Sequence, residues 1–86
     1  MSLQLKIISV ERTLFSGQVS EVTLPGEAGP FTILPSHAPI ISSLAEGCIT
    51  FIPDGKTKDA PQGNQIKISG GFAEMNEDAV TVCVTE

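Results

Sequence analysis

Histidine, cysteine and aromatic residues are scarce in this chain of 86 residues. It contains one histidine, two cysteines and four phenylalanines, and it has neither tryptophan nor tyrosine. A metal site needs three or four ligands, and one histidine with two cysteines outside a CxxC spacing does not form such a set. Two cysteines are also too few for a secreted disulfide scaffold, so we expect Cys48 and Cys83 to be reduced and buried.

Basic residues and long apolar runs are lacking as well. Five Lys and Arg against ten Asp and Glu give a net charge of −5, which argues against a phosphate-binding surface and hence against nucleic acid as a partner. No stretch approaches the roughly 18 apolar residues of a membrane span, and the N-terminus has no signal-peptide pattern. We therefore expect a soluble, cytoplasmic protein with no direct membrane insertion, whose acidic surface suits a basic protein partner.

Helical periodicity is absent too, because no capped run of ten or more residues repeats at 3.6. Apolar residues instead alternate with polar ones, as in Leu3, Leu5 and Ile7 at the start and in 80–84 near the end. About nine to ten short strands are predicted, so the fold class is all-β: an antiparallel β-sandwich or flattened barrel formed by residues 1–86 as a single domain.

The breaks between these strands are predicted from glycine, proline and changes of phase. Ser16-Gly17 should end one strand, and Val19 is out of phase with Val22, which predicts a bulge or a bend near Ser20. Residues 53–64 combine proline, glycine and charge without apolar periodicity, which is typical of a loop.

The segment PSHAP, residues 35–39, is the most distinctive part of the chain. Its two prolines exclude helix and make it a rigid corner between two strands. His37, at its centre, is a candidate for proton transfer or metal binding. Because no partner for either chemistry accompanies it, a structural or contact role is the better interpretation. Catalytic residues, metal ligands and cofactor-binding residues are therefore predicted to be absent.

Three segments together resemble a known family. They read LFSGQVSEVTLPGEAG (14–29), ILPSHAPIISSLAEGCITF (33–51) and IKISGGFAEMNEDAVTV (66–82). The same motifs, in the same order and at similar spacing, occur in the N-terminal domain of the epsilon subunit of F-type ATP synthases, called delta in mitochondria. Each motif is weak alone, but the ordered set is specific.

The resemblance implies a ten-stranded β-sandwich at the foot of the rotary central stalk, between the gamma subunit and the ring of c subunits. Such a subunit is a non-catalytic part of a peripheral complex at the cytoplasmic face of the bacterial inner membrane, without cofactor or small-molecule substrate. The gamma interface that it implies consists of Ser9, Pro35, Ser36, His37, Ala38, Pro39 and Ser42. The c-ring interface that it implies consists of Glu27, Gly29, Pro30 and Phe31.

The sequence departs from the family at two places. Pro30 stands where the family often has an acidic residue toward the ring, and Glu27 is the nearest carboxylate. The family commonly continues into a two-helix hairpin past the position of Glu86, so we expect this sequence to couple without inhibiting ATP hydrolysis. The alternative to a rotor subunit is a free-standing β-sandwich binding module unrelated to ATP synthase.

Overall fold

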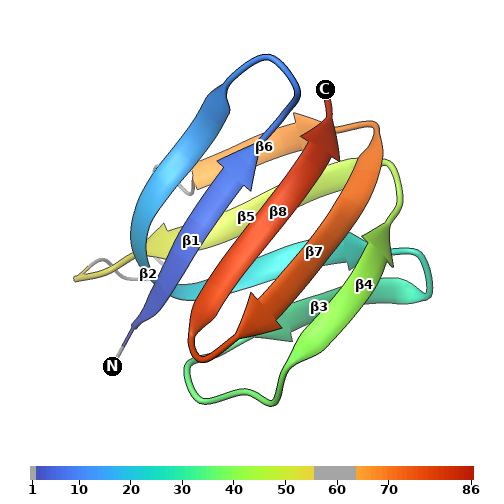
Figure 1. Cartoon of the computed structure of the whole chain (residues 1–86). Coiled ribbons are helices and arrows are strands. Elements are labelled where there is room, and N and C mark those ends of the chain that lie inside the picture. Colours follow the sequence, from blue (N-terminus) through green and yellow to red (C-terminus); the bar gives the residue numbers. More distant parts are fainter. Residues whose placement is uncertain (1, 56–63) are drawn as a thin grey trace.

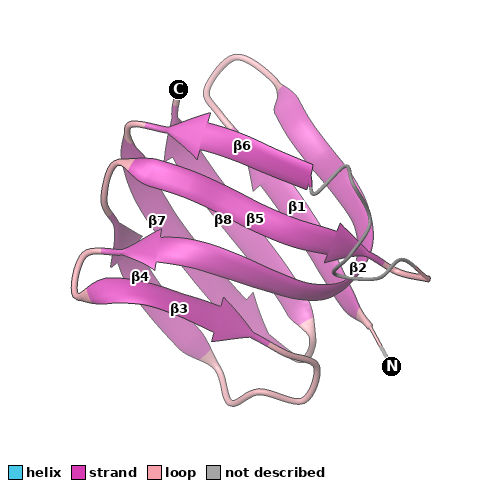
Figure 2. Cartoon of the chain, turned by 180° about the vertical axis from the view of Figure 1, so that it is seen from behind, coloured by secondary structure: helices cyan, strands magenta, loops and turns pink. Residues whose placement is uncertain are grey.

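The computed structural model describes residues 2–55 and 64–86, which form eight strands in two facing layers. The strands are β1 (Leu3–Ile8), β2 (Thr13–Gly26), β3 (Gly29–Ile33), β4 (Ile40–Leu44), β5 (Gly47–Pro53), β6 (Asn64–Ile68), β7 (Gly70–Asn76) and β8 (Ala79–Thr85). One layer holds β1, β8, β7 and β4, and the other holds β6, β5, β2 and β3 (Figure 1, Figure 2). In this described part, no helix is long and apolar enough to span a membrane. The predicted all-β sandwich is confirmed.

Strand β2 belongs to both layers and holds them together. Its first half pairs with β1, where Gly17 lies opposite Leu5, and its second half pairs with β5, where Val22 lies opposite Phe51. The register on β5 shifts between Val19 and Glu21, which confirms the bulge predicted near Ser20. A bulge strengthens the twist of a strand, and here it lets β2 pass from one layer to the other.

The predicted break at Ser16-Gly17 is wrong, and this lowers the strand number from the expected nine or ten to eight in the described residues. Gly17 stays in the ladder with β1 because the ring of Phe15 covers it: a Cβ at Gly17 would lie 3.3 Å from Phe15 Cζ. The Phe15 ring also packs against Phe51 in a tilted arrangement, with 4.3 Å between the ring centroids and 46° between the ring planes. Aromatic packing thus compensates for a residue that usually weakens a strand.

One strand pair differs from the antiparallel arrangement expected for the whole sheet. β1 pairs with β8 in parallel, while β8–β7 and β7–β4 are antiparallel. Consequently β1, β8 and β4 run in the same direction (Figure 1). The end of β1 and the start of β4 therefore lie at opposite ends of this layer.

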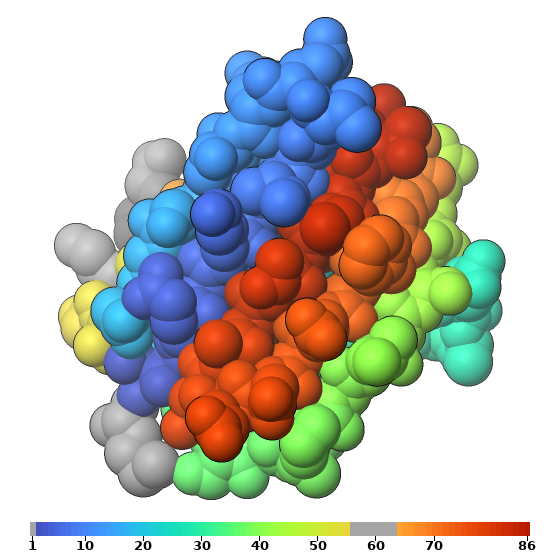
Figure 3. Space-filling model, viewed as in Figure 1, coloured from blue at the N-terminus to red at the C-terminus, as the bar shows by residue number. Residues whose placement is uncertain are grey.

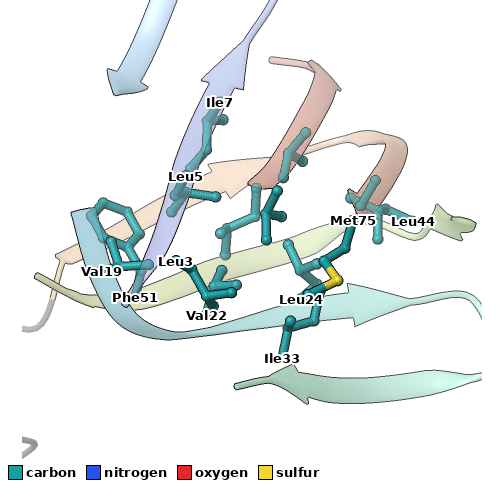
Figure 4. Close-up of a cluster of buried hydrophobic side chains, with 14 of the residues drawn as sticks. Leu3, Leu5, Ile7, Val19, Val22, Leu24, Ile33, Leu44, Phe51 and Met75 are labelled. Atoms are coloured by element: carbon teal, nitrogen blue, oxygen red, sulfur yellow. The ribbon is translucent and has the colours of Figure 1, made fainter. Parts of the chain in front are cut away.

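The core fills the space between the two layers with alternate residues of each strand. Leu3, Leu5 and Ile7 point inward from β1 into the same buried cluster as Leu24 of β2 and Met75 of β7 (Figure 4). Each of these five side chains is almost completely buried. The period of two in the sequence therefore assigned the inner face correctly.

The prediction that both cysteines are buried is wrong. Cys48 is exposed and Cys83 is half-buried, and both are free thiols. Their neighbours in the alternation, Ile49 on β5 and Val82 on β8, occupy the inner face, so the cysteines face outward. The loop predicted for 53–64 lies largely outside the described residues.

Candidate interaction surface

The PSHAP corner connects β3 to β4 through a tight turn. The backbone N–H of His37 donates to the carbonyl of Leu34 over 3.2 Å, which closes a four-residue turn with Pro35 and Ser36 at its centre. Ser36 has φ = 69°, in the left-handed region. Proline followed by a left-handed residue is the pattern of a type II turn. The corner is therefore held in one defined shape, with residues 36–39 exposed.

The His37 side chain is turned toward its own backbone neighbour. Its Nδ1 lies 2.8 Å from the carbonyl oxygen of Ala38, and the ring is exposed. Within residues 2–55 and 64–86, no three His, Cys, Asp or Glu side chains gather into a set that could hold a metal ion. A structural or contact role for His37 therefore stays a prediction.

The predicted gamma-interface residues do not form one cluster. Ser9 follows the end of β1, whereas the corner precedes the start of β4, so the two lie at opposite ends of the layer (Figure 1). Ser42 is half-buried on β4 and shares the parity of the buried Leu44. Its neighbour Ile41 faces outward instead and is 81% exposed.

The outer face of this layer links the two ends and carries exposed apolar side chains among its polar ones. Phe72 on β7 is 52% exposed and lies between Ser43 on β4 and Cys83 on β8. Ile8 on β1 lies beside Cys83 and extends the same row across the sheet. We call the face that carries Ile8, Ile41 and Phe72 the outer apolar face. Figure 3 shows this side of the layer, from β1 to β4. Exposed apolar patches of this kind mark interaction sites.

Two surface hollows lie at the two ends of the outer apolar face. The larger, of about 470 Å³, adjoins the corner and is lined by Pro39, Ile40, Ile41, Glu74, Met75 and Asn76. The smaller, of about 240 Å³, lies beside Ser9 and is lined by Ile8, Ser9, Val10, Cys83 and Val84. Val10 is fully exposed at its rim, with 102% relative exposure. A partner could therefore insert side chains at both ends of the face.

The sequence itself carries a signal for this face. In the strand Phe72-Ala73-Glu74-Met75, the inward parity belongs to Ala73 and Met75. Phe72 is therefore a large apolar residue on the parity of Glu74, which a solvated strand would give to a polar side chain. Ile41, which follows Ile40, is a second large apolar residue on the outward-facing parity of its strand.

The predicted ring-facing residues lie at the turn between β2 and β3. Glu27, Gly29 and Pro30 are exposed there, and Gly29 has φ = 129°. Phe31 differs because its ring packs against the core, and a Cβ added to Gly26 would lie 2.8 Å from it. The backbone N–H of Glu27 donates to the carbonyl of Ser43 over 3.1 Å, which places this turn beside the end of β4.

The sequence model of one protein family, described as the ATP synthase delta/epsilon chain β-sandwich domain, matches residues 2–86. The chain belongs to this family. The ATP synthase epsilon chain of Maricaulis maris is 42% identical over 84 residues, which is 98% of this chain and 59% of the relative. That of Rhodospirillum rubrum is 39% identical over 83 residues, 96% of this chain and 58% of the relative.

The chloroplastic epsilon chain of Chlamydomonas reinhardtii is 36% identical over 86 residues, 100% of this chain and 61% of the relative. The chain thus spans about three fifths of the length of these delta/epsilon relatives. Two solved structures share the fold: a chain of the Euglena gracilis mitochondrial ATP synthase, OSCP/F1/c-ring, and a chain of the Tetrahymena thermophila ATP synthase central stalk and c-ring. The first has a TM-score of 0.86, 23% identity, and coverage of 99% of this chain and 51% of that one. The second has a TM-score of 0.77, 12% identity, and coverage of 100% and 65%.

In this member of the delta/epsilon family, the Ser9 end of the outer apolar face is held by an ion pair. Arg12 Nη2 lies 2.6 Å from Glu86 Oε1, and Ser9 Oγ donates to Glu86 Oε2 over 2.9 Å. These contacts tie the β1–β2 loop to the residue after β8. The hydrogen bond from Arg12, followed by that from Ser9, lowers the pKa of Glu86 below its ordinary value of 4.5.

We expect this lowered pKa to be visible in an acid titration. A carboxyl group whose folded pKa is depressed stabilises the fold above pH 4.5, and this contribution is lost as the pH falls through the folded pKa. In an NMR titration, Glu86 should therefore titrate below 4.5. Arg12→Gln should raise the midpoint more than Ser9→Ala, because Arg12 is the larger cause. Unchanged midpoints in both variants would contradict the ion pair.

Proposed function

We propose that this chain is a non-catalytic rotor subunit of an F-type ATP synthase, which ties the gamma subunit of the central stalk to the c ring during ion-gradient-driven ATP synthesis. Membership in the delta/epsilon family supports the assignment. The observation that carries it is the outer apolar face, with Ile41 81% and Phe72 52% exposed. Exposing apolar side chains to water costs free energy, and docking on a partner removes this cost.

The gamma subunit would cover the outer apolar face from the Ser9 end to the corner end. This placement explains why the residues that the resemblance assigns to gamma lie at both ends of one layer. The corner of residues 35–39 supplies a rigid contact whose two prolines reduce the conformational entropy lost on docking. Val10 and His37 project from opposite ends of the footprint.

The c ring would contact the β2–β3 turn through Glu27, Gly29 and Pro30. These residues are exposed, while Phe31 is half-buried against the core and contributes mainly to folding. Glu27 then offers the carboxylate that Pro30 cannot provide. The complex would be a peripheral one at the cytoplasmic face of the bacterial inner membrane.

The charge of Glu27 should act on the rate of docking. If the turn is steered onto basic ring loops, Glu27→Lys will slow association severalfold at low salt and weaken its salt dependence. Stopped-flow binding to isolated rings measures both effects. Asp54→Lys, an equal charge change after β5, is the control and should leave the rate nearly unchanged. Equal rates for the Glu27 variant and wild type would place the ring contact elsewhere.

The proposed function is tested by returning the chain to its own ATP synthase after depletion of the endogenous subunit. Tagged chain should retain gamma and the catalytic-head subunits, and ion pumping per ATP hydrolysed should rise. A free-standing binding module would instead remain alone and change neither quantity. That second outcome would overturn the proposal.

A further inference from the structure

Ser36 occupies a position that favours glycine. As the third residue of the turn Leu34–His37 it has φ = 69°, and type II turns usually place glycine there. A side chain in the left-handed region is disfavoured unless its surroundings hold it. The corner therefore needs a contact that stabilises this conformation.

Asp78, which lies 42 positions further along the sequence, makes such a contact. Its Oδ1 accepts a hydrogen bond from the backbone N–H of Ser36 over 2.6 Å. Asp78 is itself fixed, because its backbone carbonyl accepts from the N–H of Gln4 over 2.8 Å. It lies in the two-residue turn between β7 and β8, where Glu77 and Asp78 have φ = 51° and 61°. This turn and the corner lie side by side (Figure 1).

The contact selects one of two turn geometries. A proline at the second position is compatible with both type I and type II turns, which differ by reversal of the peptide group between the two central residues. That peptide carries the Ser36 N–H. Only the geometry that points the N–H at Asp78 makes the hydrogen bond, so the carboxylate favours the observed state over its alternative.

We propose that Asp78 is a positioning residue, which holds Ser36 in the left-handed state and so presents the corner to its partner in one shape. The role in docking rests on the proposed function, whereas the effect on the turn does not. Loss of the contact lets the corner populate a second geometry, and the apparent affinity then falls in proportion to the competent fraction.

The first test is NMR of this chain with Asp78→Gly, which removes the carboxylate but accepts positive φ without strain. We expect the Ser36 amide to exchange about tenfold faster. The strong Pro35 Hα to Ser36 amide NOE of a type II turn should weaken. Glu77→Gly is the matched control, with the same charge change and the same turn, and it should alter neither signal. Asp78→Asn keeps an acceptor oxygen and should retain most of the protection.

Wild-type exchange and NOE in Asp78→Gly would overturn the proposal, as would equal changes in Glu77→Gly. This arm needs no partner, so it remains decisive if gamma does not bind the chain. In that case the proposed function would fail, but the NMR result would still decide whether Asp78 holds the turn.

The second test measures gamma binding by calorimetry. Asp78→Gly should weaken the affinity about tenfold, equivalent to about 1.4 kcal/mol. In a Ser36→Gly background the same change should cost less than about twofold, because glycine adopts the left-handed state unaided. A full tenfold loss in that background would show that Asp78 touches the partner directly, and would overturn the positioning role.

Discussion

Gly71→Ala should lower the free energy of unfolding by about 3 kcal/mol or more. Gly71 has φ = 148°, where L side chains are rarely found. An added Cβ would also lie 2.2 Å from the carbonyl oxygen of Cys83 and 2.9 Å from the Cα of Val84. Both obstructing atoms belong to the backbone of β8, so relief requires that β7 and β8 separate. Because this pair forms the centre of the layer of β1, β8, β7 and β4, the whole fold should be weakened.

The neighbouring glycine provides the control. At Gly70 a Cβ would meet only the carbonyl oxygen of Leu44 at 3.6 Å, an ordinary contact. Urea unfolding followed by circular dichroism should therefore show a large fall in midpoint for Gly71→Ala and a small change for Gly70→Ala. Similar midpoints for the two variants would mean that the β7–β8 geometry differs from the one described.

Phe72→Glu should weaken binding to gamma about a hundredfold, or about 2.7 kcal/mol, without unfolding the chain. The phenylalanine lies between Ser43 of β4 and Cys83 of β8 on the outer apolar face, and aromatic side chains often carry much of the energy of an interface. Glutamate removes this contact and leaves a charge that docking must desolvate. Calorimetric titration with gamma measures the loss.

Gln65→Glu is the matched control for this substitution. It makes the same charge change on an exposed strand position, but on β6 in the opposite layer. We expect its affinity to stay within about twofold of wild type, because it lies outside the proposed footprint. If the two variants lose equal affinity, net charge rather than the outer apolar face controls binding.

Much of the fold followed from the sequence because a period of two assigns residues to faces independently of tertiary structure. Leu3, Leu5 and Ile7 are buried as that period requires. The error at Ser16-Gly17 arose because local turn propensity was overridden by the ring of Phe15, a contact that propensity does not contain. The parallel pairing of β1 with β8 joins the two ends of the sequence, which a local pattern cannot predict.

The site was predicted less completely than the fold. The resemblance assigned Ser9 and the corner to one interface, but their positions at opposite ends of a layer depend on strand order and direction. The apolar residues between them, such as Phe72, are assigned to no interface by the resemblance. The contact of Asp78 with Ser36 spans 42 positions and also required the structure.

Photo-crosslinking in the assembled ATP synthase can show whether gamma covers the outer apolar face. A photoreactive phenylalanine analogue is placed at Phe72 in one sample and at Gln65 in another, and adducts are identified by mass spectrometry. We expect gamma adducts from position 72 and none from position 65. Gamma adducts from position 65 without any from position 72 would contradict this expectation.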